Sequence, residues 1–263
     1  MSNDSIKKTL LVTILLSLVC SVVVSAAAVF LKPQQDLNKV VDVQRNILAI
    51  SGLTDNAGVL TASQVADLFK QIKPRLVDLS TGKFVDASEA DIQAYDQRVA
   101  AKDPKQSHTL PAVQDVASIK RQANVAKVYT IEKAGKLETL ILPVHGYGLW
   151  STLYGFMALE GDLNTVAGLG FYEHAETPGL GGEVDNPNWK SKWAGKEVYD
   201  SKGTVELGVI KGSVDSASPA AKYQVDGLAG ATLTSNGVTN LVHFWMGKNG
   251  FGPFLEHLKA GDA

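Results

Sequence analysis

Residues 128–142, with the sequence VYTIEKAGKLETLIL, decide which fold the chain is expected to adopt. Two runs of mainly β-branched and aliphatic residues, 128–131 and 137–142, flank the short segment 133–136, which contains Gly135. Runs of this kind on either side of a glycine-containing turn are typical of a β-hairpin. We therefore expect two adjacent antiparallel strands here.

Further strands are expected on the C-terminal side of this hairpin, because residues 148–159, 165–172 and 205–210 are also rich in strand-forming residues. Helical patterns are kept apart from these strands along the chain. This arrangement predicts an α+β fold, with one N-terminal transmembrane helix followed by a soluble domain that has a mainly antiparallel sheet and flanking helices.

Helical patterns dominate the sequence before residue 121. Apolar spacing over residues 37–48 predicts an amphipathic helix, and residues 61–72 combine a capping-box spacing with a helical apolar face that Pro74 is expected to close. Residues 86–106 are expected to form a surface helix and loop. We divide the chain into residues 1–34 (N-terminus and transmembrane helix), 35–120 (helical membrane-proximal region) and 121–263.

Residues 9–31 contain no charged side chain, and about 20 apolar residues suffice for a helix to cross a bilayer. Lys7 and Lys8 precede this stretch, which predicts a cytoplasmic N-terminus, and Pro33 is expected to end the helix. The soluble domain would then lie in the periplasm, anchored by one span in a cell inner membrane. A cleaved signal peptide is the alternative, since residues 25–28 are small.

Composition excludes several kinds of chemistry. With Cys20 as its one cysteine, the 263-residue chain can form neither an internal disulfide nor a cysteine-pair zinc site, so redox chemistry must come from a cofactor. Its net charge of −2 argues against nucleic-acid binding. The five histidines show no metal-ligand spacing, so no metal site is expected. Rossmann, P-loop and nucleophile-elbow motifs are also absent from the sequence.

Residues 226–238, DGLAGATLTSNGV, bring small residues together before a helical apolar pattern. Thr234 or Ser235 is the natural N-cap of that helix. A small-residue turn at a helix N-terminus exposes backbone N–H groups that suit a phosphate. A plain capped turn without any ligand is the alternative interpretation of these residues.

The order Asp-Gly-x-x-Gly-Ala-Thr at 226–232 resembles the acceptor motif of the FMN-binding domain family, in which a flavin transferase links FMN to the last threonine through a phosphoester. In this chain that residue is Thr232, while Ala229 replaces the usual Ser or Thr. Residues 174–181, HAETPGLG, resemble a second segment of the same family. Together the two segments imply that residues 121–263 form an FMN-binding domain with covalent FMN on Thr232.

Over its full length the chain resembles the C subunits of Na⁺-translocating NADH:quinone reductases. The resemblance implies an electron-relay subunit of a sodium-pumping oxidoreductase, with the chain itself an electron carrier that has no catalytic residue. Oxidation of NADH, reduction of ubiquinone and sodium transport would take place on other subunits of the complex. The implied partners are those subunits, the flavin transferase and the lipid bilayer, with no nucleic acid. The G subunits of Rnf-type complexes share anchor and motif, and a tethered non-redox binding module is a further alternative.

The cofactor-binding residues expected from this resemblance lie around Thr232 and in the earlier segment. Glu176 and Thr177 are expected to hydrogen-bond the flavin ring or its ribityl chain. Lys211 would place positive charge near the flavin. The other candidates are neighbours of Thr232 or apolar side chains for packing against the ring: Gly230, Ala231, Leu233, Thr234, Leu180 and Trp150.

Overall fold

The computed structural model describes residues 5–54 and 56–263. By their internal contacts, residues 1–43 and residues 44–263 form two compact units. The division at residues 34 and 120 stays a prediction of the sequence.

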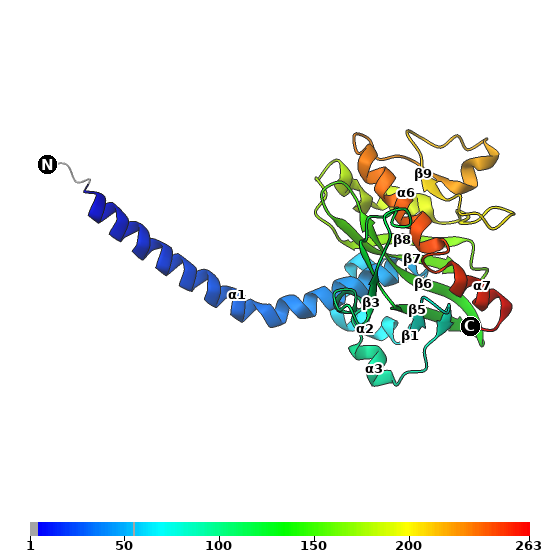
Figure 1. The fold of residues 1–263 in the computed structure, drawn as a ribbon, viewed down its shortest axis with the longest axis horizontal. Coiled ribbons are helices and arrows are strands. Elements are labelled where there is room, and N and C mark those ends of the chain that lie inside the picture. The colour runs from blue at the N-terminus through cyan, green and yellow to red at the C-terminus, as the bar shows by residue number, and fades with distance from the viewer. Residues whose placement is uncertain (1–4, 55) are drawn as a thin grey trace. The chain divides into compact units, whose positions relative to one another are not determined.

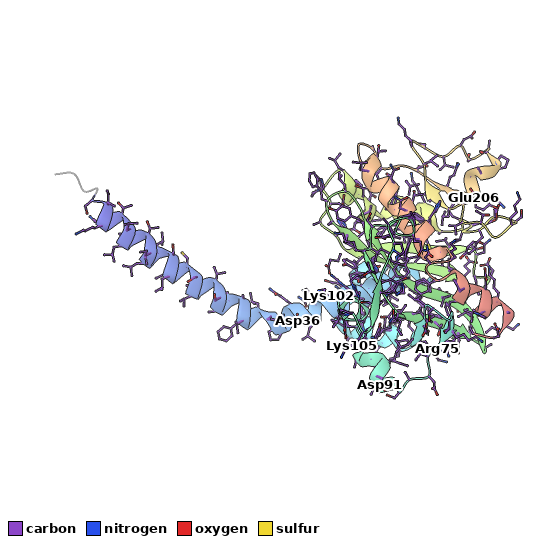
Figure 2. All side chains as sticks on the ribbon, in the orientation of Figure 1. Asp36, Arg75, Asp91, Lys102, Lys105 and Glu206 are labelled. Carbon is purple, nitrogen blue, oxygen red and sulfur yellow. The ribbon has the colours of Figure 1, made fainter. Side chains whose placement is uncertain are left out.

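The first unit consists of most of helix α1 (Ile6–Ile50), which passes through Pro33 without ending. The expectation that Pro33 ends the helix is wrong. Proline removes one helical hydrogen bond and crowds the preceding turn, but a long helical stretch on each side tolerates one such defect. An 18-residue window of α1 has a mean hydropathy of 2.7 and no buried residue, and its side chains are exposed on all sides (Figure 2). This helix is therefore long and apolar enough to cross a membrane.

The second unit is built on a six-stranded sheet in the order β2-β1-β5-β6-β7-β8, in which every neighbouring pair is antiparallel (Figure 1). The strands are β1 (Lys73–Asp78), β2 (Lys83–Phe84), β5 (Val125–Lys133), β6 (Lys136–Tyr147), β7 (Thr152–Glu160) and β8 (Val166–Glu173). This confirms the predicted α+β fold with a mainly antiparallel sheet.

The expected hairpin is the connection between β5 and β6. Lys133 pairs with Lys136, and the two residues between them, Ala134 and Gly135, have φ angles of 50° and 75°. Positive φ at both central positions is what a two-residue turn of type I′ requires, because its twist matches that of the strands. The glycine therefore fixes the register of the central strands.

Both faces of the sheet are covered. Successive side chains on a strand point to opposite faces, yet Leu140, Ile141 and Leu142 of β6 are all fully buried. On one face lies α6 (Thr232–Met246), which runs beside β6 and whose Trp245 indole donates to the carbonyl oxygen of His145 at 2.7 Å (Figure 1). Helix α7 (Gly252–Ala260) adds Phe254 to the same core.

Residues 44–50 and α2 (Ala62–Phe69) pack against the other face. The side chain of Asn46 donates to the carbonyl oxygen of Phe171 at 2.8 Å, and the ring of Phe69 meets that of Tyr129 edge-on, 6.0 Å between centroids. The capping box expected at Thr61 is confirmed, because its side chain and that of Gln64 each accept from the other's backbone N–H.

The remaining elements are short. They are η1 (Ala57–Val59), α3 (Glu89–Ala94), α4 (Gln97–Ala100), β3 (Ser107–Thr109), β4 (Arg121–Ala123), η2 (Gly181–Asp185), α5 (Pro187–Lys190), η3 (Ser191–Trp193), β9 (Gly208–Val209), η4 (Pro219–Tyr223) and β10 (Gln224–Val225). Strands β3 and β4 pair antiparallel, whereas β9 and β10 pair parallel.

Three local expectations differ from the structure. Residues 35–120 were expected to be helical, but β1, β2 and β3 lie within them, and β1 pairs with β5 in the main sheet. Pro74 lies inside β1 and not at the end of a helix, because α2 has already ended at Phe69. The strand expected at 205–210 is reduced to the two residues of β9.

The docking of α6 on the sheet depends on Gly237, where an added Cβ would lie 2.5 Å from the carbonyl oxygen of Tyr147. Gly237→Ala raises helix propensity by about 1 kcal/mol. We nevertheless expect it to destabilise the domain by about 1–2 kcal/mol net, because the backbones must move apart. Thermal unfolding of the full chain in detergent should show a midpoint several degrees lower.

Gly58→Ala is the matched control, since its Cβ meets nothing within 4 Å. An unchanged midpoint for Gly237→Ala would contradict this account.

Candidate functional site

The site lies where the chain turns into α6. Gly230 has a φ of +72°, Ala231 is the N-cap, and the exposed Thr232 is the first helical residue. Ala231 provides no side-chain cap, because its methyl group accepts no hydrogen bond. The helix therefore begins with an exposed hydroxyl at the positive end of the helix dipole. Beside this hydroxyl lie the first-turn N–H groups, for which the N-cap side chain supplies no acceptor.

The expectation that Thr234 or Ser235 is the N-cap is wrong. Both lie inside the first turn and are buried, 0% and 4% exposed. The hydroxyl of Thr234 donates to Glu176 Oε2 at 2.8 Å, and the hydroxyl of Ser235 accepts from the backbone N–H of Leu228 at 3.1 Å. Their side chains hold the helix to other segments, so Thr232 is the one exposed hydroxyl among residues 231–235.

The carboxylate of Glu176 joins two loops to this helix. Its Oε1 accepts hydrogen bonds from the backbone N–H groups of residues 149–151, at 3.0, 2.9 and 3.1 Å. Its Oε2 accepts from Thr234. Glycine is required beside it at two positions, since a Cβ at Gly148 or Gly181 would lie 2.6 Å from a carboxylate oxygen. Glu176 thus fixes the loop after β6, the loop after β8 and the start of α6 against one another.

The hydrogen bonds also set the charge of Glu176. Burial alone would raise the pKa of this carboxyl group, but the backbone N–H groups of residues 149–151 and the hydroxyl of Thr234 outweigh burial and lower the pKa below its ordinary value. The group is therefore ionised at neutral pH, when it can only accept hydrogen bonds. All five of its donors, which include the hydroxyl of Ser151 at 3.5 Å, match that state.

Three large apolar side chains on these joined segments are exposed. Trp150 is 67% exposed, Leu180 43% and Leu233 58%. Trp150 belongs to the loop held by Glu176, Leu180 precedes Gly181, and Leu233 precedes Thr234. A Cβ at Gly230 would lie 2.9 Å from Leu180, so this side chain rests against the turn before Thr232. Exposed apolar side chains held in place in this way suit a flat, largely apolar ligand.

Hydrogen bonds of Asp226 hold the first residue of the 226–238 segment in place. The carboxylate of Asp226 accepts from Lys192 Nζ and, at 2.7 Å, from the backbone N–H of Val214, while its backbone oxygen accepts from the Trp189 indole at 2.8 Å. The hydrogen bond from Lys192 is the main reason that the pKa of Asp226 lies below its ordinary value. Lys192 was not expected from the sequence, because 34 residues separate it from Asp226.

The structure places the other expected residues less centrally. Thr177 is exposed, and its backbone oxygen accepts from the N–H groups of Leu180 and Gly182 at 3.1 and 2.9 Å, which closes the turn carrying Leu180. Lys211 is exposed beside Gly212, whose backbone oxygen accepts from Gly227 at 2.8 Å, so this lysine neighbours the first residues of the 226–238 segment. Among the described residues, no cluster of three or more His, Cys, Asp or Glu could hold a metal ion.

Comparison with known proteins identifies the region that contains this site. A family model described as FMN-binding domain matches residues 148–247, which include Trp150, Glu176, Leu180 and Thr232. Among solved structures, Shewanella oneidensis NqrC has a TM-score of 0.73 at 39% identity and covers 82% of this chain and 96% of its own. The C subunit of the Na⁺-translocating NADH-quinone reductase of Parabacteroides distasonis has a TM-score of 0.64 at 25% identity, covering 86% and 96%.

Curated relatives match over the whole length. The C subunit of the Na⁺-translocating NADH-quinone reductase of Pseudomonas aeruginosa is 57% identical over 263 residues, covering 100% of this chain and 99% of the relative. The protein of that name from Vibrio vulnificus is 51% identical over 261 residues, covering 99% and 98%. These similarities favour the C subunits of the reductases over the G subunits of Rnf-type complexes. The chain belongs to the family of C subunits of Na⁺-translocating NADH-quinone reductases.

Proposed function

We propose that this chain relays electrons within its reductase complex through an FMN that is phosphoester-linked to Thr232. The observation that carries the proposal is the exposed Thr232 hydroxyl at the uncapped start of α6, inside the segment that matches the FMN-binding domain. Thr234 and Ser235, the next hydroxyls along the chain, are buried and hydrogen-bonded elsewhere.

The residues at the start of α6 fit a phosphate. The N-cap residue supplies no acceptor for the first-turn N–H groups, and phosphate oxygens are acceptors that also interact favourably with the positive end of a helix. Gly230 leaves the turn before Thr232 free of a side chain, since any Cβ there would meet Leu180. The phosphate would thus complete a helix terminus that the chain leaves without a side-chain cap.

The exposed apolar side chains fit the flavin ring. Trp150, Leu180 and Leu233 would pack against it, while Glu176 acts behind them by holding their three segments together. We expected Glu176 to hydrogen-bond the flavin directly, but its oxygens already accept from five protein donors. When bound, FMN supplies the electron-transfer chemistry, and this chain's residues orient the cofactor.

The long apolar helix α1 supports a proposal for the location of the chain. We propose that α1 spans a cell inner membrane once, with the N-terminus in the cytoplasm and residues 44–263 in the periplasm. Residues 9–31 contain no charged side chain that could line an ion path, so sodium transport would belong to other subunits, together with NADH oxidation and ubiquinone reduction. A flavin transferase would attach the FMN during maturation.

Co-expression of the full chain with and without a flavin transferase tests the proposal. Trypsin is expected to release residues 223–248, which contain Thr232, and mass spectrometry should show this peptide heavier by FMN less one water only when the transferase is present. In the assembled complex, NADH should bleach the visible absorption of this flavin. A flavin-free chain beside an active transferase would leave a non-redox binding module as the function.

Trp150→Ala is expected to change the flavin environment without unfolding the domain. Because the side chain is 67% exposed, its loss should alter the free energy of unfolding by no more than about 0.5 kcal/mol. The backbone N–H of residue 150 can still reach Glu176. We expect normal covalent loading but stronger quenching of flavin fluorescence by acrylamide. Val113→Ala, at another exposed apolar residue (89%), should change neither property, and equal quenching in all three proteins would remove Trp150 from the ring site.

A further inference from the structure

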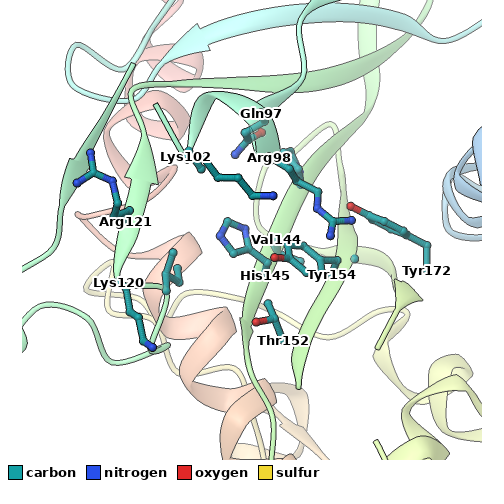
Figure 3. Close-up of a pocket in the computed structure, with 14 residues that line it drawn as sticks. Gln97, Arg98, Lys102, Lys120, Arg121, Val144, His145, Thr152, Tyr154 and Tyr172 are labelled. Atoms are coloured by element: carbon teal, nitrogen blue, oxygen red, sulfur yellow. The ribbon is translucent and has the colours of Figure 1, made fainter. Parts of the chain in front are cut away.

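A cavity of about 510 Å³ lies apart from Thr232 and its neighbours, between α4, the segment 119–121 and strands β6, β7 and β8 (Figure 3). Its size falls within the range of small-molecule sites, about 300–1,000 Å³. The cavity is lined by Gln97, Arg98, Ala101, Lys102, Ile119, Lys120, Arg121, Pro143, Val144, His145, Thr152, Tyr154, Gly155 and Tyr172. All of these residues belong to the compact unit 44–263.

The charged side chains that line the cavity are all basic. Four lining side chains are cationic, and none of the lining residues is acidic, although the chain as a whole has a net charge of −2. Within residues 5–54 and 56–263, neither Lys102 nor Lys120 takes part in an ion pair. Figure 3 shows Lys102 pointing into the cavity above the ring of His145. Two unpaired ammonium groups at one concave site favour an anionic ligand.

The two arginines are held in fixed positions. Arg98 donates to both carboxylate oxygens of Glu173, at 2.7 and 2.9 Å, and lies 3.8 Å from the centre of the Tyr154 ring. Arg121 donates to the hydroxyls of Ser107 and Thr109, at 2.8 and 2.9 Å through its terminal nitrogens. Both guanidinium groups are therefore held by protein partners before any ligand arrives, and the carboxylate of Glu173 balances the charge of Arg98. The two lysines carry the unpaired positive charge of the cavity.

Aromatic rings form one wall of the cavity. The rings of His145 and Tyr154 are stacked, with 5.5 Å between centroids and 23° between planes. Burial, together with the nearby charge of Arg98, lowers the pKa of His145 to about 4, despite the opposing effect of Asp115. The imidazole is thus neutral at pH 7 and packs between the rings of Tyr154 and Trp245, the latter with 5.0 Å between centroids. Together with the side chains of Val144 and Ile119, it gives the cavity an uncharged wall.

We propose that this cavity binds a small organic anion whose phosphate or carboxylate is attached to an apolar group. Lys102 and Lys120 contact the anionic group, and the apolar group packs beside Val144 and Ile119. The site is separate from the one proposed for FMN, because none of the cavity's lining residues is among those that surround Thr232.

Calorimetric titration of the full chain in detergent with phenyl phosphate and, separately, with benzoate tests this site at pH 7.5. We expect Lys102→Gln and Lys120→Gln each to weaken binding of the preferred anion about fivefold, as for exposed charge pairs, and raised salt to weaken it further. Lys105→Gln is the matched control. Lys105 is exposed in the same loop as Lys102 (Figure 2), and it is not among the residues that line the cavity.

A second readout locates the binding. Histidine ring resonances should shift on titration for His145 but not for His257, which lies near the C-terminus on α7 and pairs with Asp262. The proposal would be overturned if Lys105→Gln weakened binding as much as Lys102→Gln does. It would also be overturned if binding left the ring resonances of His145 unshifted. If neither phenyl phosphate nor benzoate bound but an oligoglutamate peptide did, this result would also overturn the proposal. It would assign the cavity to an acidic protein segment.

Discussion

The Thr232→Val variant is expected to carry no covalent flavin when it is produced beside an active flavin transferase. Valine keeps the branched shape of threonine but lacks the hydroxyl that a phosphoester needs. Thr232 is exposed at the first position of α6, so its replacement should leave the fold intact. Fluorescence of the denatured protein band under ultraviolet light should fall from full intensity in the wild type to background in the variant.

Two further variants make this result specific. Thr232→Ser restores a hydroxyl at the same backbone position and should recover part of the covalent fluorescence. Asn236→Ala changes an exposed residue one turn further along α6 and should keep all of it. A fluorescent Thr232→Val band would move the attachment to another hydroxyl. Thr234 and Ser235 would have to leave their buried hydrogen bonds to provide it, so this outcome would contradict the site geometry as well as the assignment.

The central hairpin and the site segments were predictable because local sequence determines them. A two-residue turn with positive φ at Ala134 and Gly135 is encoded within residues 128–142, and the apolar face of α6 is encoded by its own spacing. The resemblance to FMN-binding domains rests on two short segments, and the family comparisons match the region that contains both.

The N-cap of α6 was predicted wrongly because the hydroxyl groups in its first turn form hydrogen bonds with residues outside the helix. Local rules make Thr234 and Ser235 good N-caps, but Thr234 bonds to a carboxylate 58 residues away. Pro74 likewise suggests the end of a helix until β5 is known to lie beside it, with Pro74 opposite Tyr129. Neither partner is visible in a local pattern.

The cavity beside His145 was not predictable for the same reason. Its four cations come from α4 and from residues 119–121, and its ring wall comes from β6 and β7. Only the pairing of β6 with β7 and the packing of α4 against β5 bring these segments together. Fold prediction from sequence thus succeeded where contacts are local, and the linear motifs pointed to the region that the FMN-binding domain model matches.

The Glu176→Ala variant is expected to show the largest loss of stability of any substitution at the site. Removing the carboxylate leaves the backbone N–H groups of residues 149–151 and the hydroxyl of Thr234 without their acceptor. Each unsatisfied buried donor costs about 1–3 kcal/mol, and partial access of water reduces the sum to an expected loss of about 3–4 kcal/mol. Denaturant unfolding should give this difference, together with reduced flavin loading, because the loops and α6 are no longer held together.

The charge of Glu176 can be separated from its shape with Glu176→Gln. Because hydrogen bonds lower its pKa in the folded protein, the ionised carboxylate stabilises the fold above the unfolded pKa of about 4.3, and this stabilisation is lost as the pH falls through the folded value. The wild type should therefore be more stable than Glu176→Gln at pH 6, and the difference should shrink toward pH 3. Glu160→Gln, at an exposed residue that ends β7, is the matched control substitution. A difference between wild type and Glu176→Gln that stays constant with pH would mean that shape and not charge accounts for the role of Glu176 in joining the two loops to α6.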